Sequence, residues 1–158
     1  MSSLYDVDFY AWTSEQAEVL RKAAHGGSNE PLDFENLAEE IESLGKSDKR
    51  ALKSEISRII HHLVKLQYSP VSDPRGGWYR TIDEAREQIE RILEDSPSLR
   101  AEVSLLADAE MGRAKRAAIR DLERRNELQP GMRRAIERAR FTEDQITGDW
   151  FPKEPEAR

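Results

Sequence analysis

Metal binding is the first chemistry to test, because helical bundles can hold a di-iron pair through Glu-x-x-His motifs. The sequence has three histidines, His25, His61 and His62. The residues three positions before the adjacent pair are Arg58 and Ile59, so neither of these histidines has the glutamate that the motif requires. Adjacent histidines also point about 100° apart on a helix and cannot easily share an ion. We therefore predict no metal site, and no motif in the sequence predicts a cofactor.

Acid–base chemistry is the second possibility, and it would be carried by Glu40, His62 and Arg86. Each of the three lies on the flank of the apolar stripe of its expected helix, where a polar side chain is partly buried. One interpretation is a polar network that fixes how the helices pack. The other is a small-molecule pocket or hydrolase-like site in which Glu40 and His62 act as acid and base. The sequence leaves both open, because it cannot show a pocket.

Other catalytic chemistries lack their motifs. The sequence contains no Gly-x-Ser-x-Gly elbow, no phosphate-binding glycine loop and no dinucleotide fingerprint. It also contains no cysteine, which excludes disulfides, thiolate metal sites and cysteine nucleophiles. We assign no catalytic residue and favour a protein that is not an enzyme.

The charge is distributed unevenly along the chain, although the formal net charge is only -6. Residues 1–46 hold ten acids and three bases, a net charge of -7, whereas residues 113–140 hold ten bases and four acids, a net charge of +6. The basic segment could bind nucleic acid. It contains no aromatic residue to stack on a base, and its four acids are spaced for ion pairs within helices. The alternative is that acidic and basic helices complement each other, within one chain or across a dimer.

The elements that position these residues are expected to be helices, because long Leu-, Ala-, Glu- and Arg-rich stretches are separated by short Gly and Pro clusters. We predict an all-α helical bundle of about five or six largely antiparallel helices, forming one domain over residues 1–152 with a frayed tail at 153–158. Gly45 and Pro70 are expected to end two of the helices. The expected helices cover residues 8–24, 33–44, 47–68, 78–94, 97–125 and 130–139, followed by a short turn from Thr142.

The long fifth helix, at 97–125, changes its apolar face along its length. Leu99, Val103 and Leu106 share one face, and a second face is rotated by roughly 100° from it. This second face is smooth and narrow, which would allow another helix to approach closely. We therefore predict a possible homodimer through this face, formed by Met111, Ala114, Ala118 and Leu122.

Several stretches of the sequence resemble a bacterial family, the domain-of-unknown-function family twenty-nine. They are YDVDFYAWTSEQAEVLR at 5–21, DFENLAEEIESLG at 33–45, HLVKLQYSP at 62–70, WYRTIDEAREQIERILEDSPSLR at 78–100, and a closing motif at 141–152. The resemblance implies an all-helical fold in a bacterial protein. The family carries no assigned activity, so the resemblance implies nothing about chemistry.

Glu40, His62 and Arg86 also fall on positions that match the motifs of this family. No apolar run approaches the roughly 20 residues of a membrane span, and the first residues carry acids where a signal peptide would carry bases. The main expectation is therefore a non-enzymatic cytoplasmic helical protein that acts through protein–protein contacts with an unknown partner. The alternatives are the site of Glu40, His62 and Arg86, and nucleic-acid binding through residues 113–140.

Overall fold

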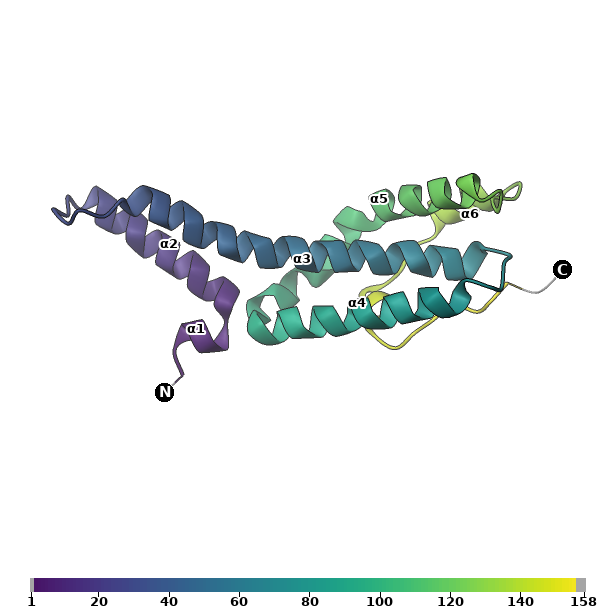
Figure 1. The fold of residues 1–158 in the computed structure, drawn as a ribbon, viewed down its shortest axis with the longest axis horizontal. Helices are drawn as coiled ribbons and strands as arrows, with labels where there is room; N and C mark the ends of the chain where they lie inside the picture. Colours follow the sequence, from purple (N-terminus) through teal and green to yellow (C-terminus); the bar gives the residue numbers. More distant parts are fainter. Residues whose placement is uncertain (1, 156–158) are drawn as a thin grey trace. The chain divides into compact units, whose positions relative to one another are not determined.

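The structure is a computed structural model that describes residues 2–155, and its regular elements within that range are all helical (Figure 1). The prediction of an all-α fold is confirmed. The elements in chain order are α1 (Leu4–Val7), α2 (Phe9–His25), α3 (Phe34–Tyr68), α4 (Arg75–Asp95), the 3-10 helix η1 (Pro97–Glu102), α5 (Val103–Arg124), α6 (Met132–Arg138) and α7 (Glu143–Thr147).

The helices pack into two compact units. Unit 1 contains residues 2–52 and 91–102, and unit 2 contains residues 53–90 and 103–155. The boundary between the units falls within α3 and within α4, so each of these helices contributes residues to both. These units describe packing and not independent folding, so the single domain over residues 1–152 stays a prediction.

Unit 1 is organised around the junction between its first two helices, where Asp8 caps α2. The Oδ1 atom of Asp8 accepts a hydrogen bond from the backbone N–H of Ala11 at 2.9 Å, which satisfies one free donor of the first turn. The Oδ2 atom of the same carboxylate accepts from the backbone N–H of Ser98 at 2.7 Å. One buried carboxylate therefore starts α2 and fastens it to η1.

The structure corrects the expected helix end at Gly45. Helix α3 runs without a break through Gly45, so the two helices expected at 33–44 and 47–68 are one helix of 35 residues. Glycine in a helix interior costs about 1 kcal/mol relative to alanine, but packing can outweigh that cost. Here α2 crosses against Gly45 so closely that a Cβ at this position would lie 2.2 Å from Thr13 Oγ1. Gly45 is a packing glycine and not a helix cap.

The long fifth helix is confirmed, with a change in its first turns. Residues 97–102 form η1 and continue directly into α5, which ends at Arg124. The buried core of unit 2 lies between α5, the later part of α3 and α4, which Figure 1 shows side by side. Its largest fully buried side chains are Ile56, Ile59, Ile60, Leu63, Leu66, Ile82, Ile89, Leu122, Ile136 and Ile146.

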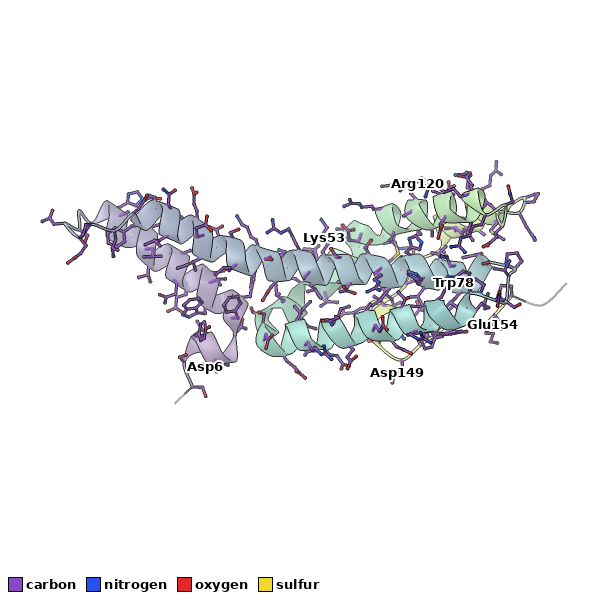
Figure 2. The ribbon with its side chains drawn as sticks, viewed as in Figure 1. Asp6, Lys53, Trp78, Arg120, Asp149 and Glu154 are labelled. Carbon is purple, nitrogen blue, oxygen red and sulfur yellow. The ribbon has the colours of Figure 1, made fainter. Side chains whose placement is uncertain are left out.

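Part of the tail that we expected to be frayed makes contacts in unit 2. Tyr79 Oη donates a hydrogen bond to Glu154 Oε1 at 3.2 Å, and Arg75 Nε lies 3.3 Å from the same oxygen. Figure 2 labels Glu154 at this end of α4. The rest of the predicted frayed tail, residues 156–158, lies outside the described residues.

Candidate functional site

The three residues proposed for acid–base chemistry lie in different surroundings. Glu40 is exposed on α3 in unit 1, whereas His62 and Arg86 belong to unit 2. The imidazole Nδ1 of His62 lies 2.9 Å from the backbone carbonyl oxygen of Arg58, one turn earlier. Burial lowers the pKa of His62 to about 4, so the ring is neutral at pH 7. His62 is therefore half-buried, and its ring hydrogen-bonds to the backbone of its own helix.

Arg86 on α4 binds the backbone of residues 145–150. Its Nε donates to the carbonyl oxygen of Ile146 at 2.9 Å, and its Nη2 donates to those of Gln145 and Trp150 at 2.8 and 2.6 Å. Its guanidinium also lies 4.7 Å from the ring centroid of Phe151. Burial lowers the pKa of Arg86. These contacts are structural, because the guanidinium binds backbone carbonyls of α7 and of the segment after it.

A second polar cluster in unit 2 was missed by sequence reasoning, and it is centred on Asp121. The ammonium of buried Lys65 lies 2.8 Å from Asp121 Oδ2 and 4.6 Å from the ring centroid of Trp78. His61 Nε2 lies 3.4 Å from the same oxygen, and Arg125 pairs with Oδ1. Burial acts to raise the pKa of Asp121, but the hydrogen bonds from Lys65 and His61 outweigh it and hold the pKa at about 2. The cluster joins α3, α4 and α5, and its chemistry is that of a structural ion pair.

The residues predicted to form a dimer face on the fifth helix do not lie on the surface. All four are buried within unit 2, with no more than 3% of each exposed, because the chain's own helices cover them. The burial corrects the proposed face only, and the homodimer itself stays a prediction. The four residues are Met111, Ala114, Ala118 and Leu122.

The basic segment at 113–140 is only partly available to a ligand. Lys115 is buried and donates to the carbonyl oxygens of Glu137 and Ala139 at 2.7 and 2.9 Å. Arg133 pairs with Glu123. The arginines that remain exposed on α5 and form no ion pair with a described carboxylate are Arg113, Arg116, Arg120 and Arg124.

Exposed large hydrophobic side chains gather in unit 1. Of the nine in the described part of the chain, seven belong to unit 1, and only Leu105 and Trp150 belong to unit 2. Single exposed hydrophobic residues are ordinary, and only a contiguous patch indicates an interaction surface, so the positions of these residues on their helices matter. The seven are Leu4, Tyr5, Val7, Val19, Leu32, Leu37 and Leu44.

Helix α2 and the first part of α3 form a hairpin (Figure 1), and the two edges of this hairpin differ in their residues. Small buried residues, including Ala17 and Ala38, line its contact. One edge is closed by an ion pair between Arg21 and Glu42. At 100° per residue, Val19 on α2 projects about 160° away from the buried contact residue Ala17, so it lies on the outer face of α2.

The other edge of this hairpin is apolar. On α3, Leu37 and Leu44 project to the side of the contact opposite Glu42. Half-buried Trp12 lies on the same side of α2. We call Trp12, Leu37 and Leu44 the apolar edge.

An open cavity of about 350 Å³ lies in the same unit, lined by Tyr5, Asp6, Phe9, Asp48 and Asp95. The ring of Tyr5 packs edge-on against Phe9 at 6.0 Å and against Trp12 of the apolar edge at 4.9 Å. Aromatic faces together with carboxylates suit an organic cation, such as the side chain of arginine or lysine.

The carboxylates of the cavity are not equivalent. Asp48 Oδ2 accepts a hydrogen bond from Ser96 Oγ at 3.3 Å, and burial, with Asp95 close by, raises the pKa of Asp48. A bound cation would offset both the burial of Asp48 and the repulsion from Asp95, because its positive charge favours the ionised carboxylate. Within residues 2–155, no three histidine, aspartate or glutamate side chains gather closely enough to hold a metal ion.

Comparison with known proteins decides the family. The family model described as "Domain of unknown function DUF29" matches residues 4–151. The chain belongs to the DUF29 family. The match to DUF29 includes α1 to α7, and it confirms the resemblance expected from the sequence. No curated protein matches the sequence.

One solved structure shows the same fold as this DUF29 chain. It is a crystal structure described as an alpha-helical protein of unknown function from Rhodospirillum rubrum. The sequences are 24% identical, the TM-score is 0.74, and the match covers 96% of this chain and 93% of the other. The similarity therefore supports the fold and does not indicate a function. Among the described helices of this DUF29 protein, none is both long and apolar enough to cross a bilayer.

Proposed function

We propose that this DUF29 protein acts through protein contacts, and that a protein partner binds along the apolar edge of unit 1. The observation that carries the proposal is the exposure of Leu37 and Leu44, at 40% and 52%, on one side of the α2–α3 hairpin. Fully burying a Val or Leu side chain contributes about 1.5–3 kcal/mol. Even partial burial of these two, together with Trp12, would supply the centre of a protein interface.

The interior of the hairpin gives a second reason to expect a partner. Its contact is made by small side chains, with Ala17, Ala38 and Gly45 buried between the helices. Such a contact buries little apolar area, since most of it is methyl groups and backbone. A helix that packs on the apolar edge would complete a three-helix arrangement with a larger core.

The charge of unit 1 favours a basic partner over a second copy. Residues 1–46 carry a net charge of -7, and exposed Asp33, just before α3, and exposed Glu40, on α3, lie beside the apolar edge. A homodimer through this edge would bring these acids together, which costs energy. We therefore propose as the partner an amphipathic helix with arginine or lysine beside its apolar residues. One of these basic side chains enters the cavity of Tyr5, Phe9 and Asp48.

We also propose that the protein works in the bacterial cytoplasm. The support is the bacterial family that its motifs resemble, together with a sequence that has no cysteine for the disulfides of many secreted domains.

Co-purification of tagged variants from the native organism tests the partner proposal. The variant Leu37→Glu/Leu44→Glu changes only exposed positions, so the fold should persist, but the apolar edge becomes charged. We expect partner recovery to fall at least tenfold. The control is Leu105→Glu, because Leu105 is 72% exposed in unit 2 and lies outside the edge. Equal recovery with both variants would contradict the proposal, and light scattering would show whether the bound species is a second copy.

A further inference from the structure

Four arginines form a stripe along α5. Arg113, Arg116, Arg120 and Arg124 follow one another at spacings of three, four and four residues, and all four are exposed. At 100° and 1.5 Å per residue they lie within an arc of roughly 80° and extend over about 16 Å. Figure 2 labels Arg120 in this stripe. We call these four residues the arginine stripe.

The acids near the stripe already have other partners in unit 2. Asp121 pairs with Lys65 at 2.8 Å, and Glu123 pairs with Arg133 on α6. Asp108, one turn before the stripe, lies 3.4 Å from Arg140. Within residues 2–155 no carboxylate forms an ion pair with an arginine of the stripe. Its positive charge is therefore available to a ligand from outside.

The composition of this helix face indicates what the ligand is. Within this arc the other exposed residue of α5 is Ala109, and half-buried Ala117 borders it. Exposed Leu105 lies about two turns before Arg113, so no large apolar side chain lies along the length of the stripe. A protein partner normally buries an apolar centre, whereas a phosphodiester backbone needs only charge and hydrogen-bond donors. Guanidinium groups can contact phosphate oxygens through two parallel hydrogen bonds.

We propose that the arginine stripe binds the phosphodiester backbone of nucleic acid, without regard to base sequence. No aromatic side chain lies on the stripe to stack on a base, so only the backbone is contacted. The proposal does not depend on the apolar edge, which belongs to unit 1. The chain as a whole carries -6, so there is no long-range attraction, and binding is weak and confined to low salt.

Salt dependence of DNA binding tests the proposal quantitatively. The probe is a fluorescently labelled 20-base-pair duplex, titrated with the full chain by anisotropy between about 25 and 200 mM NaCl. Four phosphate contacts predict a slope of log K against log salt of about -3.6, because each contact contributes about -0.9. The variant Arg116→Gln/Arg120→Gln removes two contacts, so its slope should be about -1.8.

The matched control is Arg50→Gln/Arg80→Gln, which removes the same charge from two exposed positions outside the stripe. Its slope should equal that of the wild type, and circular dichroism should show that both variants keep their helices. A second duplex of different sequence should bind equally. The proposal is overturned if no binding occurs at 25 mM NaCl, or if both variants change the slope alike. It is also overturned if poly-glutamate competes as well as unlabelled duplex, which would assign the stripe to an acidic polypeptide.

Discussion

Gly45 of α3 lies directly against Thr13 of α2, and there is no room between them for a methyl group. A Cβ on Gly45 would meet Thr13 Oγ1 at 2.2 Å and both Thr13 Cβ and Tyr10 Cδ2 at 3.3 Å. Thr13 cannot easily move aside, because it is buried and its hydroxyl donates to the carbonyl oxygen of Tyr10 at 2.7 Å. This single glycine therefore sets how closely the two helices of the hairpin approach.

The first prediction concerns this contact. Gly45→Ala should lower the free energy of unfolding, because overpacking costs about 1–3 kcal/mol and exceeds the gain in helix propensity of about 1 kcal/mol. Gly112→Ala on α5 is the control, since its Cβ would meet only the flexible end of Arg116 at 3.1 Å. Thermal unfolding should show a lower Tm for the first variant and an equal or higher Tm for the second. A higher Tm for Gly45→Ala would contradict the close contact.

The second prediction concerns the ion pair of Lys65 and Asp121. Asp121→Asn leaves a buried ammonium without its counter-charge, which costs 3–5 kcal/mol when both partners are fully buried. Because about a quarter of the Asp121 side chain is exposed, we expect the free energy of unfolding to fall by about 2–3 kcal/mol. Urea unfolding at pH 7 measures this change. An unchanged free energy of unfolding would show that the pair contributes nothing.

The same pair makes stability depend on pH. The pKa of Asp121 is about 2 in the folded chain and 3.8 for the ordinary group, so its contribution is complete above pH 4. It is lost as the pH falls from about 4 to 2, because the unfolded chain takes up the proton first. Wild type should lose more stability than Asp121→Asn over this interval. If the free energy of unfolding falls equally with pH in the two proteins, the lowered pKa of Asp121 is contradicted.

The third prediction concerns Arg86. Arg86→Met keeps the aliphatic stem but removes three hydrogen bonds to the carbonyl oxygens of residues 145, 146 and 150. Hydrogen exchange of a peptide covering 142–152 should then be at least tenfold faster. Arg80→Met, at an exposed position of the same helix, is the control and should leave exchange unchanged. Equal protection in both variants would mean that other contacts hold this segment.

The fourth prediction concerns the cavity of unit 1. Titration with Nα-acetylarginine amide should shift the backbone NMR signals of Tyr5, Phe9, Asp48 and Asp95 saturably at millimolar concentration. The neutral analogue Nα-acetylcitrulline amide should produce no such shifts, and Asp48→Asn/Asp95→Asn should abolish those caused by arginine. Equal shifts with both compounds would exclude recognition of the cation.

The sequence predicts the helices well where local chemistry decides the outcome. Asp33 starts α3 with Oδ1 accepting from the backbone N–H of Asn36 at 3.3 Å, and Thr142 caps α7, as their residue types indicate. Gly45 was misjudged because a capping glycine and a packing glycine have the same local signature, and only the approach of α2 distinguishes them.

The candidate site was less predictable, because it depends on packing between distant segments. The periodicity of α5 identifies its small-residue face correctly, but it does not say whether the chain's own helices or another chain will cover Met111 and Ala118. Arg86 was placed correctly on a helix flank, but its partners are backbone carbonyls about 60 residues later, which have no sequence signature. The cavity joins Tyr5 to Asp48 and Asp95, and no motif links these positions.

Site-specific photo-crosslinking tests the central claim most directly. A benzoylphenylalanine at position 44 places the reactive group on the apolar edge, and one at position 105 places it on an exposed site of unit 2. Irradiation in living cells should give a discrete heterologous adduct from position 44, absent from position 105 and lost when Leu37→Glu is added. The account is contradicted if position 44 gives no adduct, or if both positions give the same one.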